Sequence, residues 1–203
     1  MEIVLIIIGI NILAFVTPFV VQFTGSYPTS YLNFVSMGWK NNSDIAGGEY
    51  YRLLTSTFLH DVDIFHLLFN MWSLWNISPL MLQLFKPGGF LIIYLVSGVV
   101  GSYLSFLFNT SNSLGASGSI FGLLGALLAY SVLGGRTDLL TSILINIFII
   151  VAYSFLPGAR IDNFGHLGGL LAGFVSVLFF SSVNFSSQCS VLTQRLAHST
   201  TNA

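Results

Sequence analysis

The sequence predicts an all-α membrane protein built as a bundle of six transmembrane helices. Its 203 residues are 54% hydrophobic and only 6% charged, and the mean hydropathy is +0.85. Soluble domains carry about 25% charged residues, so this chain has too few to cover a surface that faces water. Six apolar segments also approach the roughly 20 residues that a helix needs to cross about 30 Å of hydrocarbon.

The boundaries of these segments follow from the polar turns between them, for example Lys86-Pro87-Gly88-Gly89. The predicted spans cover residues 3–23, 65–85, 90–108, 117–133, 139–156 and 163–183. Together they form one predicted membrane domain over residues 1–183. The first loop, 24–57, is rich in aromatic residues and is expected to lie partly in the headgroup zone. The polar tail, 184–203, is expected to be disordered.

Charge excludes some partners and leaves the orientation open. The net charge of −1 provides no basic stripe for phosphates, so no nucleic-acid partner is expected. Six spans put both termini on one side, but the basic residues divide evenly, with Lys86, Arg136 and Arg195 on that side and Lys40, Arg52 and Arg160 on the other. The absence of an evident targeting peptide favours a prokaryotic plasma membrane. The sequence does not determine the oligomeric state.

The polar residues inside the predicted spans are uncharged or histidine. None of the seven acidic and six basic residues falls well inside a span, which argues against an ion-coupled transporter or a channel. Spans two, four and six run in the same direction, so their first residues lie on the same face of the membrane. Each begins with a reactive side chain, namely His66, Ser117 or His166. We therefore expect these three groups at similar depth.

Stripes of small residues predict which spans touch. Gly118, Gly122, Gly125 and Ala129 recur along span four, and Gly169 and Gly173 share a face with His166 on span six. Such faces let two helix backbones approach closely in lipid. Taken alone, the glycines are better explained by general helix packing, but both stripes begin at a reactive residue, which favours a functional contact. Ser117 and His166, 166 − 117 = 49 residues apart, are therefore expected to meet.

These residues suit acyl transfer. A serine hydroxyl becomes a nucleophile when an adjacent base takes its proton, and His166 is the available base. No Asp or Glu is placed to orient its ring, so we expect a dyad instead of a triad. His66 and Asn70, one turn apart on span two, and the Ser117 backbone N–H are candidate oxyanion donors. An interhelical hydrogen bond is the ordinary alternative for His66 and Asn70.

A zinc site is the competing chemistry. Three histidines (His60, His66 and His166) could bind zinc in principle, but the chain has no H-E-x-x-H motif and no carboxylate accompanies them. We therefore expect no metal and no other cofactor. His60 is expected to have a structural role where the chain enters span two.

The ordered set of motifs resembles the rhomboid family of intramembrane serine proteases. The resemblance covers residues 49–173 and rests on four motifs: Gly115-x-Ser117-Gly118, His66-x-x-x-Asn70, His166-x-x-Gly169-x-x-x-Gly173 and Tyr51-Arg52 in the first loop. Each motif alone is weak, whereas their order on the right spans is specific.

The resemblance implies a serine endopeptidase that cleaves single-pass transmembrane proteins in the bilayer, with its termini in the cytoplasm. It implies Ser117 as nucleophile, His166 as base, and His66, Asn70 and the Ser117 amide as oxyanion donors. Supporting residues would be Gly115, Gly118, Phe121, Gly169 and Gly173. Span five and the loop 157–162 would act as a gate and a cap.

One departure from the family pattern concerns the ring beside His166. Phe121 stands where the family often has tyrosine, so packing against the histidine would be kept and a hydroxyl lost. The alternative function is a catalytically silent rhomboid-like protein that binds transmembrane clients. Such relatives usually lack the serine or the histidine, and this chain has both.

Overall fold

The computed structural model describes residues 1–23, 31–154 and 161–179, and the elements in these ranges are helices. This confirms the predicted all-α class. The elements are α1 (Glu2–Phe23), α2 (Tyr31–Ser36), α3 (Asn42–Ala46), α4 (Arg52–Thr55), the 3₁₀ turn η1 (Ser56–Phe58), α5 (Ile64–Phe108), α6 (Ser117–Leu133), α7 (Thr137–Ser154) and a final helix, Asn163–Phe179. The predicted tail, 184–203, lies outside the described residues.

Among the described residues, α1 and α5 are long and apolar enough to cross a membrane by length and composition. The shorter apolar helices are Ser117–Leu133, Leu139–Phe148 and Asn163–Phe179. The count of six spans therefore stays a prediction.

The turn predicted at residues 86–89 lies where it was expected but is tighter than predicted. Two helices that share the label α5 meet there at a kink, and Lys86 is the residue with non-helical backbone angles, φ 59° and ψ 170°. Pro87 follows directly as a helical residue. Proline suits the first turn of a helix because its φ is already helical and its missing N–H would have no intrahelical partner there. The chain therefore reverses through one residue instead of four.

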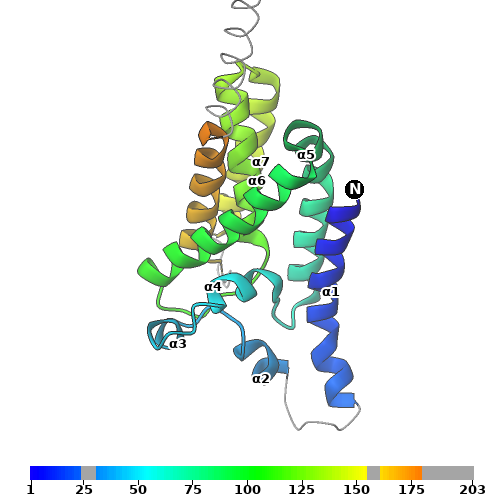
Figure 1. Cartoon of the computed structure of the whole chain (residues 1–203), viewed down its shortest axis with the longest axis vertical. Helices are drawn as coiled ribbons and strands as arrows, with labels where there is room; N and C mark the ends of the chain where they lie inside the picture. Colours follow the sequence, from blue (N-terminus) through cyan, green and yellow to red (C-terminus); the bar gives the residue numbers. More distant parts are fainter. Residues whose placement is uncertain (24–30, 155–160, 180–203) are drawn as a thin grey trace, which may run out of the picture.

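The helices pack in an order that brings the predicted spans two, four and six together. Figure 1 shows α1 alongside the first half of α5, and α6 beside α5 and α7. The first half of α5, α6 and the final helix all begin at the end of the bundle where α2, α3 and α4 lie (Figure 1). Large buried side chains fill the space between the helices, among them Leu74, Met81, Phe90, Ile93, Tyr94 and Leu123.

Glycines set the distance between α6 and the final helix. A Cβ added at Gly169 would lie 2.0 Å from the Gly118 carbonyl oxygen, and one at Gly173 would lie 1.8 Å from that of Gly122. The two backbones thus touch along the stripes that the sequence indicated. Any side chain at these positions would push the helices apart, and His166 lies in the first turn of the same final helix.

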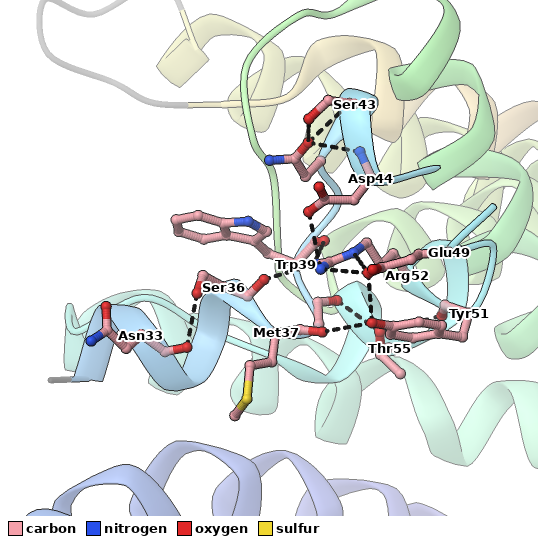
Figure 2. Close-up of polar contacts among 12 residues, drawn as sticks. Asn33, Ser36, Met37, Trp39, Ser43, Asp44, Glu49, Tyr51, Arg52 and Thr55 are labelled. Carbon is pink, nitrogen blue, oxygen red and sulfur yellow. Dashed lines mark hydrogen bonds and ion pairs between the residues drawn. The ribbon is translucent and has the colours of Figure 1, made fainter. Parts of the chain in front are cut away.

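A buried arginine holds the first loop in shape (Figure 2). The Arg52 guanidinium donates to the carbonyl oxygens of Ser36 at 2.7 Å and Trp39 at 3.2 Å. It also forms ion pairs with Asp44 at 3.0 Å and Glu49 at 2.7 Å. Because α4 leads through η1 to the start of α5, this network fixes the path of the chain into α5. The predicted contact of this loop with headgroups stays a prediction, and residues 24–30 lie outside the described ranges.

Candidate active site

The serine loop is built around Gly115. This residue has φ of +126°, a left-handed conformation that favours glycine, and its N–H donates to the Ser56 carbonyl at 2.9 Å. A Cβ at position 115 would lie 2.9 Å from Nε2 of His66. Only glycine therefore lets the loop approach His66 this closely. Ser117 follows as the first residue of α6, so its backbone N–H has no partner within the helix.

His166 reaches Ser117 from the first turn of the final helix. Its Nε2 lies 2.8 Å from the Ser117 Oγ, which is hydrogen-bonding distance. The Phe121 ring stacks on the His166 imidazole, with centroids 4.2 Å apart and 8° between the planes. The stack and the hydrogen bond together fix both the tilt and the direction of the imidazole. This arrangement can pass the hydroxyl proton to the ring when the oxygen attacks an electrophile.

The two oxyanion candidates on α5 have different environments. The Nδ1 of His66 lies 3.3 Å from a carboxylate oxygen of Asp61, and its Nε2 faces Gly115. The buried Asn70 amide donates to the His66 carbonyl at 2.9 Å, one turn earlier in the helix. An amide NH₂ has a second hydrogen, which that bond does not use. His66 thus faces the serine loop directly, whereas Asn70 also supports the helix that carries it.

Ser117 and His166 border a small pocket. Its other lining residues include Ser56, Ser102 and Asp162. Neither His66 nor Asn70 is among its lining residues. Hydroxyl groups and a carboxylate make this pocket suitable for water, which is the second substrate of any hydrolysis.

Asp162 is a site residue that the sequence reasoning missed. Its carboxylate accepts hydrogen bonds from the Ser105 hydroxyl, from the Asn109 amide at 3.1 Å and from the Gly165 backbone N–H at 3.0 Å. Its own carbonyl accepts the N–H of His166 at 3.0 Å. Asp162 therefore caps the final helix and ties it to the end of α5. An aspartate just before an apolar run is a recognisable N-cap signal, and that signal could have found it.

His60 packs against His66 instead of reaching the serine. The two rings lie edge to face with centroids 5.0 Å apart, and His60 is buried. Burial, with the nearby His66, lowers the pKa of His60 to about 3, so its ring is neutral near neutral pH. Among the described residues, no group of three or more His, Cys, Asp or Glu side chains could hold a metal ion.

Comparison with known proteins assigns the chain to a family. The Rhomboid domain model matches residues 47–183, which is more than half of the chain. The chain belongs to the rhomboid family. The matched range contains the four candidate site residues His66, Asn70, Ser117 and His166, and it begins after α1 and most of the first loop. Rhomboid proteins are integral membrane proteins, which agrees with the composition.

The rhomboid relatives come from bacteria, plants and protozoa. The chain is 43% identical over 170 residues to Rhomboid protease GluP of Bacillus subtilis (strain 168), covering 82% of this chain and 32% of that protein. It is 40% identical over 133 residues to RHOMBOID-like protein 1 of Arabidopsis thaliana, covering 63% and 33%. It is 32% identical over 139 residues to Rhomboid-like protease 3 of Toxoplasma gondii, covering 66% and 52%. This rhomboid chain thus spans a third to a half of the length of these relatives.

Proposed function

We propose that this chain is an intramembrane serine endopeptidase that cuts transmembrane protein segments with Ser117 and His166. The observation that carries the proposal is the 2.8 Å contact between the Ser117 Oγ and the His166 Nε2. These two groups come from helix starts 49 residues apart, and the glycine contacts between α6 and the final helix bring them together. The protease name of the Bacillus relative supports the same reaction class.

In the proposed reaction, the Ser117 Oγ attacks the carbonyl carbon of a peptide bond while the His166 Nε2 takes its proton. The negative charge that develops on the carbonyl oxygen is met by the Ser117 backbone N–H and by His66 and Asn70, each such donor typically contributing about 10²–10³ in rate. His166 then gives the proton to the leaving amine, which breaks the C–N bond and leaves an acyl-enzyme. A water from the pocket then attacks the acyl carbon while His166 takes one of its protons. The bond between that carbon and the Ser117 Oγ breaks, His166 returns the proton to Oγ, and the second product leaves with a new carboxyl group.

The proposed substrates are single-pass transmembrane proteins with segments that unwind easily. A peptide bond inside a helix is shielded by its own turn, so the substrate must leave the helical state before the serine can reach it. We propose a prokaryotic plasma membrane as the location and cytoplasmic termini as the orientation. The proposed gate is α7, and the proposed cap is the loop 157–162, of which residues 157–160 lie outside the described ranges.

The test is cleavage of a reporter transmembrane substrate by the purified chain in proteoliposomes. Ser117→Ala is expected to lower the cleavage rate by about 10⁴-fold or more, because it removes the nucleophile. Ser119→Ala is the matched control: it removes a buried hydroxyl two residues along the same helix, outside the pocket, and is expected to cleave.

A fluorophosphonate probe gives an independent readout. It is expected to label Ser117 in the parent and in Ser119→Ala, and to fail in Ser117→Ala and His166→Ala. Cleavage that persists in Ser117→Ala would refute the nucleophile assignment. A folded parent that neither cleaves nor reacts with the probe would instead support a client-binding protein without catalysis.

A further inference from the structure

The oxyanion candidate His66 has a carboxylate behind it. Oδ1 of Asp61 lies 3.3 Å from the His66 Nδ1 and also accepts the Asp63 backbone N–H at 3.2 Å. The second bond anchors the carboxylate within the short loop before α5. The other ring nitrogen, Nε2, is turned to Gly115 in the serine loop. His66 therefore connects a negative charge on one side with the catalytic serine loop on the other.

The proton count on this ring decides what it can donate. A neutral imidazole carries one N–H, and its other nitrogen is an acceptor. A ring nitrogen that faces a carboxylate holds its proton there, which would leave Nε2 with a lone pair. A lone pair at Nε2 would repel a developing oxyanion instead of stabilising it. Both sides of His66 are satisfied only when both nitrogens carry a proton.

We propose that Asp61 is a positioning residue that favours the imidazolium form of His66, with one proton on Nδ1 toward Asp61 and the other on Nε2 toward the oxyanion. This inference rests on the proposed protease function. It assigns a role to a carboxylate that touches neither the serine nor His166. A hydrogen bond from a charged donor is about twice as strong as one from a neutral donor, so the imidazolium is the better oxyanion ligand.

Asp61 is the charged partner of the His66 ring, because the other titratable groups near the ring are neutral. The buried His60 ring, 5.0 Å from His66, is neutral because its pKa is lowered to about 3. The Tyr31 hydroxyl bonds to the His60 carbonyl at 3.0 Å, and burial, with the charge of Asp61, raises its pKa to about 12. His166 must be neutral to act as the base. No cation among these neighbours therefore competes for the carboxylate.

Removing the Asp61 charge is expected to have a small effect on the rate, because both side chains of the pair are partly exposed. The side chains of His66 and Asp61 are 30% and 48% exposed, so water screens their attraction. Exposed ion pairs contribute about 0.2–1 kcal/mol, which corresponds to a change in rate of up to about fivefold. This is small beside the loss expected on removing the whole donor with His66→Ala, about 10²-fold or more.

The experiment compares kcat and KM across pH for the parent, Asp61→Asn and Asp63→Asn in proteoliposomes. An asparagine side chain in place of Asp61 can keep the bond to the Asp63 N–H but loses the charge. We expect Asp61→Asn to lower kcat up to about fivefold with little change in KM, and to lose activity at a lower pH than the parent as pH rises. High salt should narrow the difference by screening the pair.

Asp63→Asn is the matched control for charge and for loop structure. The Asp63 carboxylate caps α5 through the Phe65 N–H at 3.0 Å, and asparagine caps a helix about as well. This variant is expected to follow the pH profile of the parent. If the profiles of Asp61→Asn and Asp63→Asn coincide, or if only KM changes, the role of Asp61 is refuted.

¹⁵N NMR of the histidine rings separates this inference from the proposed function, because it needs no turnover. At a given pH, a larger share of His66 rings should carry protons on both nitrogens in the parent than in Asp61→Asn. Equal shares in the two proteins at every pH would overturn the inference even if the parent cleaves its substrate. A larger share in a parent that does not cleave would uphold the role of Asp61 in the ring's charge and refute the protease function.

Discussion

At the scale of single residues, the direction of the His166 ring depends on two contacts. Its Nε2 meets the Ser117 hydroxyl, and its face lies flat on Phe121. The hydrogen bond fixes only one end of the ring, so a second contact is needed to stop the imidazole from turning about it. The phenyl ring provides that contact by stacking alone. A hydroxyl at position 121 is therefore not required to orient the His166 ring.

Removing the stack is expected to reduce catalysis without removing the dyad. Phe121→Ala should lower kcat by up to about tenfold, because an aromatic pair contributes about 0.5–1.5 kcal/mol beyond its buried area. Phe121→Tyr keeps a ring in the same place and should lose less activity than Phe121→Ala. Single-turnover cleavage of the reporter measures this. Equal losses in the two variants would show that the ring does not orient His166.

At the scale of elements, the candidate active site depends on how closely α6 approaches the final helix. Carbonyl oxygens of α6 occupy the places that side chains at Gly169 and Gly173 would fill. Lipid provides no hydrophobic drive for association, so close backbone packing is what keeps the two helices together. The hydroxyl and the imidazole can meet only while that packing holds.

One methyl group in this contact is therefore expected to disturb the whole pair. In Gly173→Ala the new Cβ would lie 1.8 Å from the Gly122 oxygen, and overpacking of this kind costs about 1–3 kcal/mol. We expect a lower midpoint of thermal unfolding in detergent and weaker fluorophosphonate labelling of Ser117. Gly9→Ala in α1 is the control, since its Cβ would meet nothing within 4 Å. An unchanged midpoint in Gly173→Ala would contradict the packing.

The long helices could be predicted because their signals are local, and the Ser117–His166 contact could be expected from the small-residue stripes on two such helices. An apolar run ends where polar residues begin, and α6 starts and stops at the predicted residues, Ser117 and Leu133. The short helices α2, α3 and α4 could not be predicted in this way. They are held by contacts from distant parts of the loop, such as those of Arg52 with Ser36 and Asp44, and no periodicity in the sequence records such contacts.

At the scale of the whole molecule, three distant segments join beside the candidate active site. The fully buried Lys40 of the first loop donates to the carbonyls of Asn109 at 2.6 Å and Ser111 at 2.9 Å. The Asn109 side chain in turn donates to Asp162, which caps the final helix. In the sequence, Lys40 and Asp162 resemble ordinary solvated loop charges. Their burial results from the assembled fold, so sequence patterns alone could not reveal it.

Asp162 makes the stability of this junction depend on pH. Burial raises the pKa of its carboxyl, but the hydrogen bonds from Ser105, Gly165, Ser113 and Asn109 outweigh burial and hold the pKa below the ordinary value of 3.8. A carboxylate with a lowered pKa in the folded state stabilises the fold above its unfolded pKa. That contribution is lost as pH falls through the folded value.

Replacing Asp162 is therefore expected to destabilise the protein at neutral pH and much less in acid. Asp162→Ala removes the acceptor for several donors, and hydrogen bonds to a charged group contribute about 1.5–3 kcal/mol. The difference in unfolding midpoint between parent and variant should be full at neutral pH and should shrink below the ordinary value of 3.8. Asp162→Asn keeps one acceptor, so its unfolding midpoint at neutral pH should lie between those of the parent and Asp162→Ala. A difference that stays constant from neutral to strongly acidic pH would show that the charge on Asp162 does not hold the final helix in place.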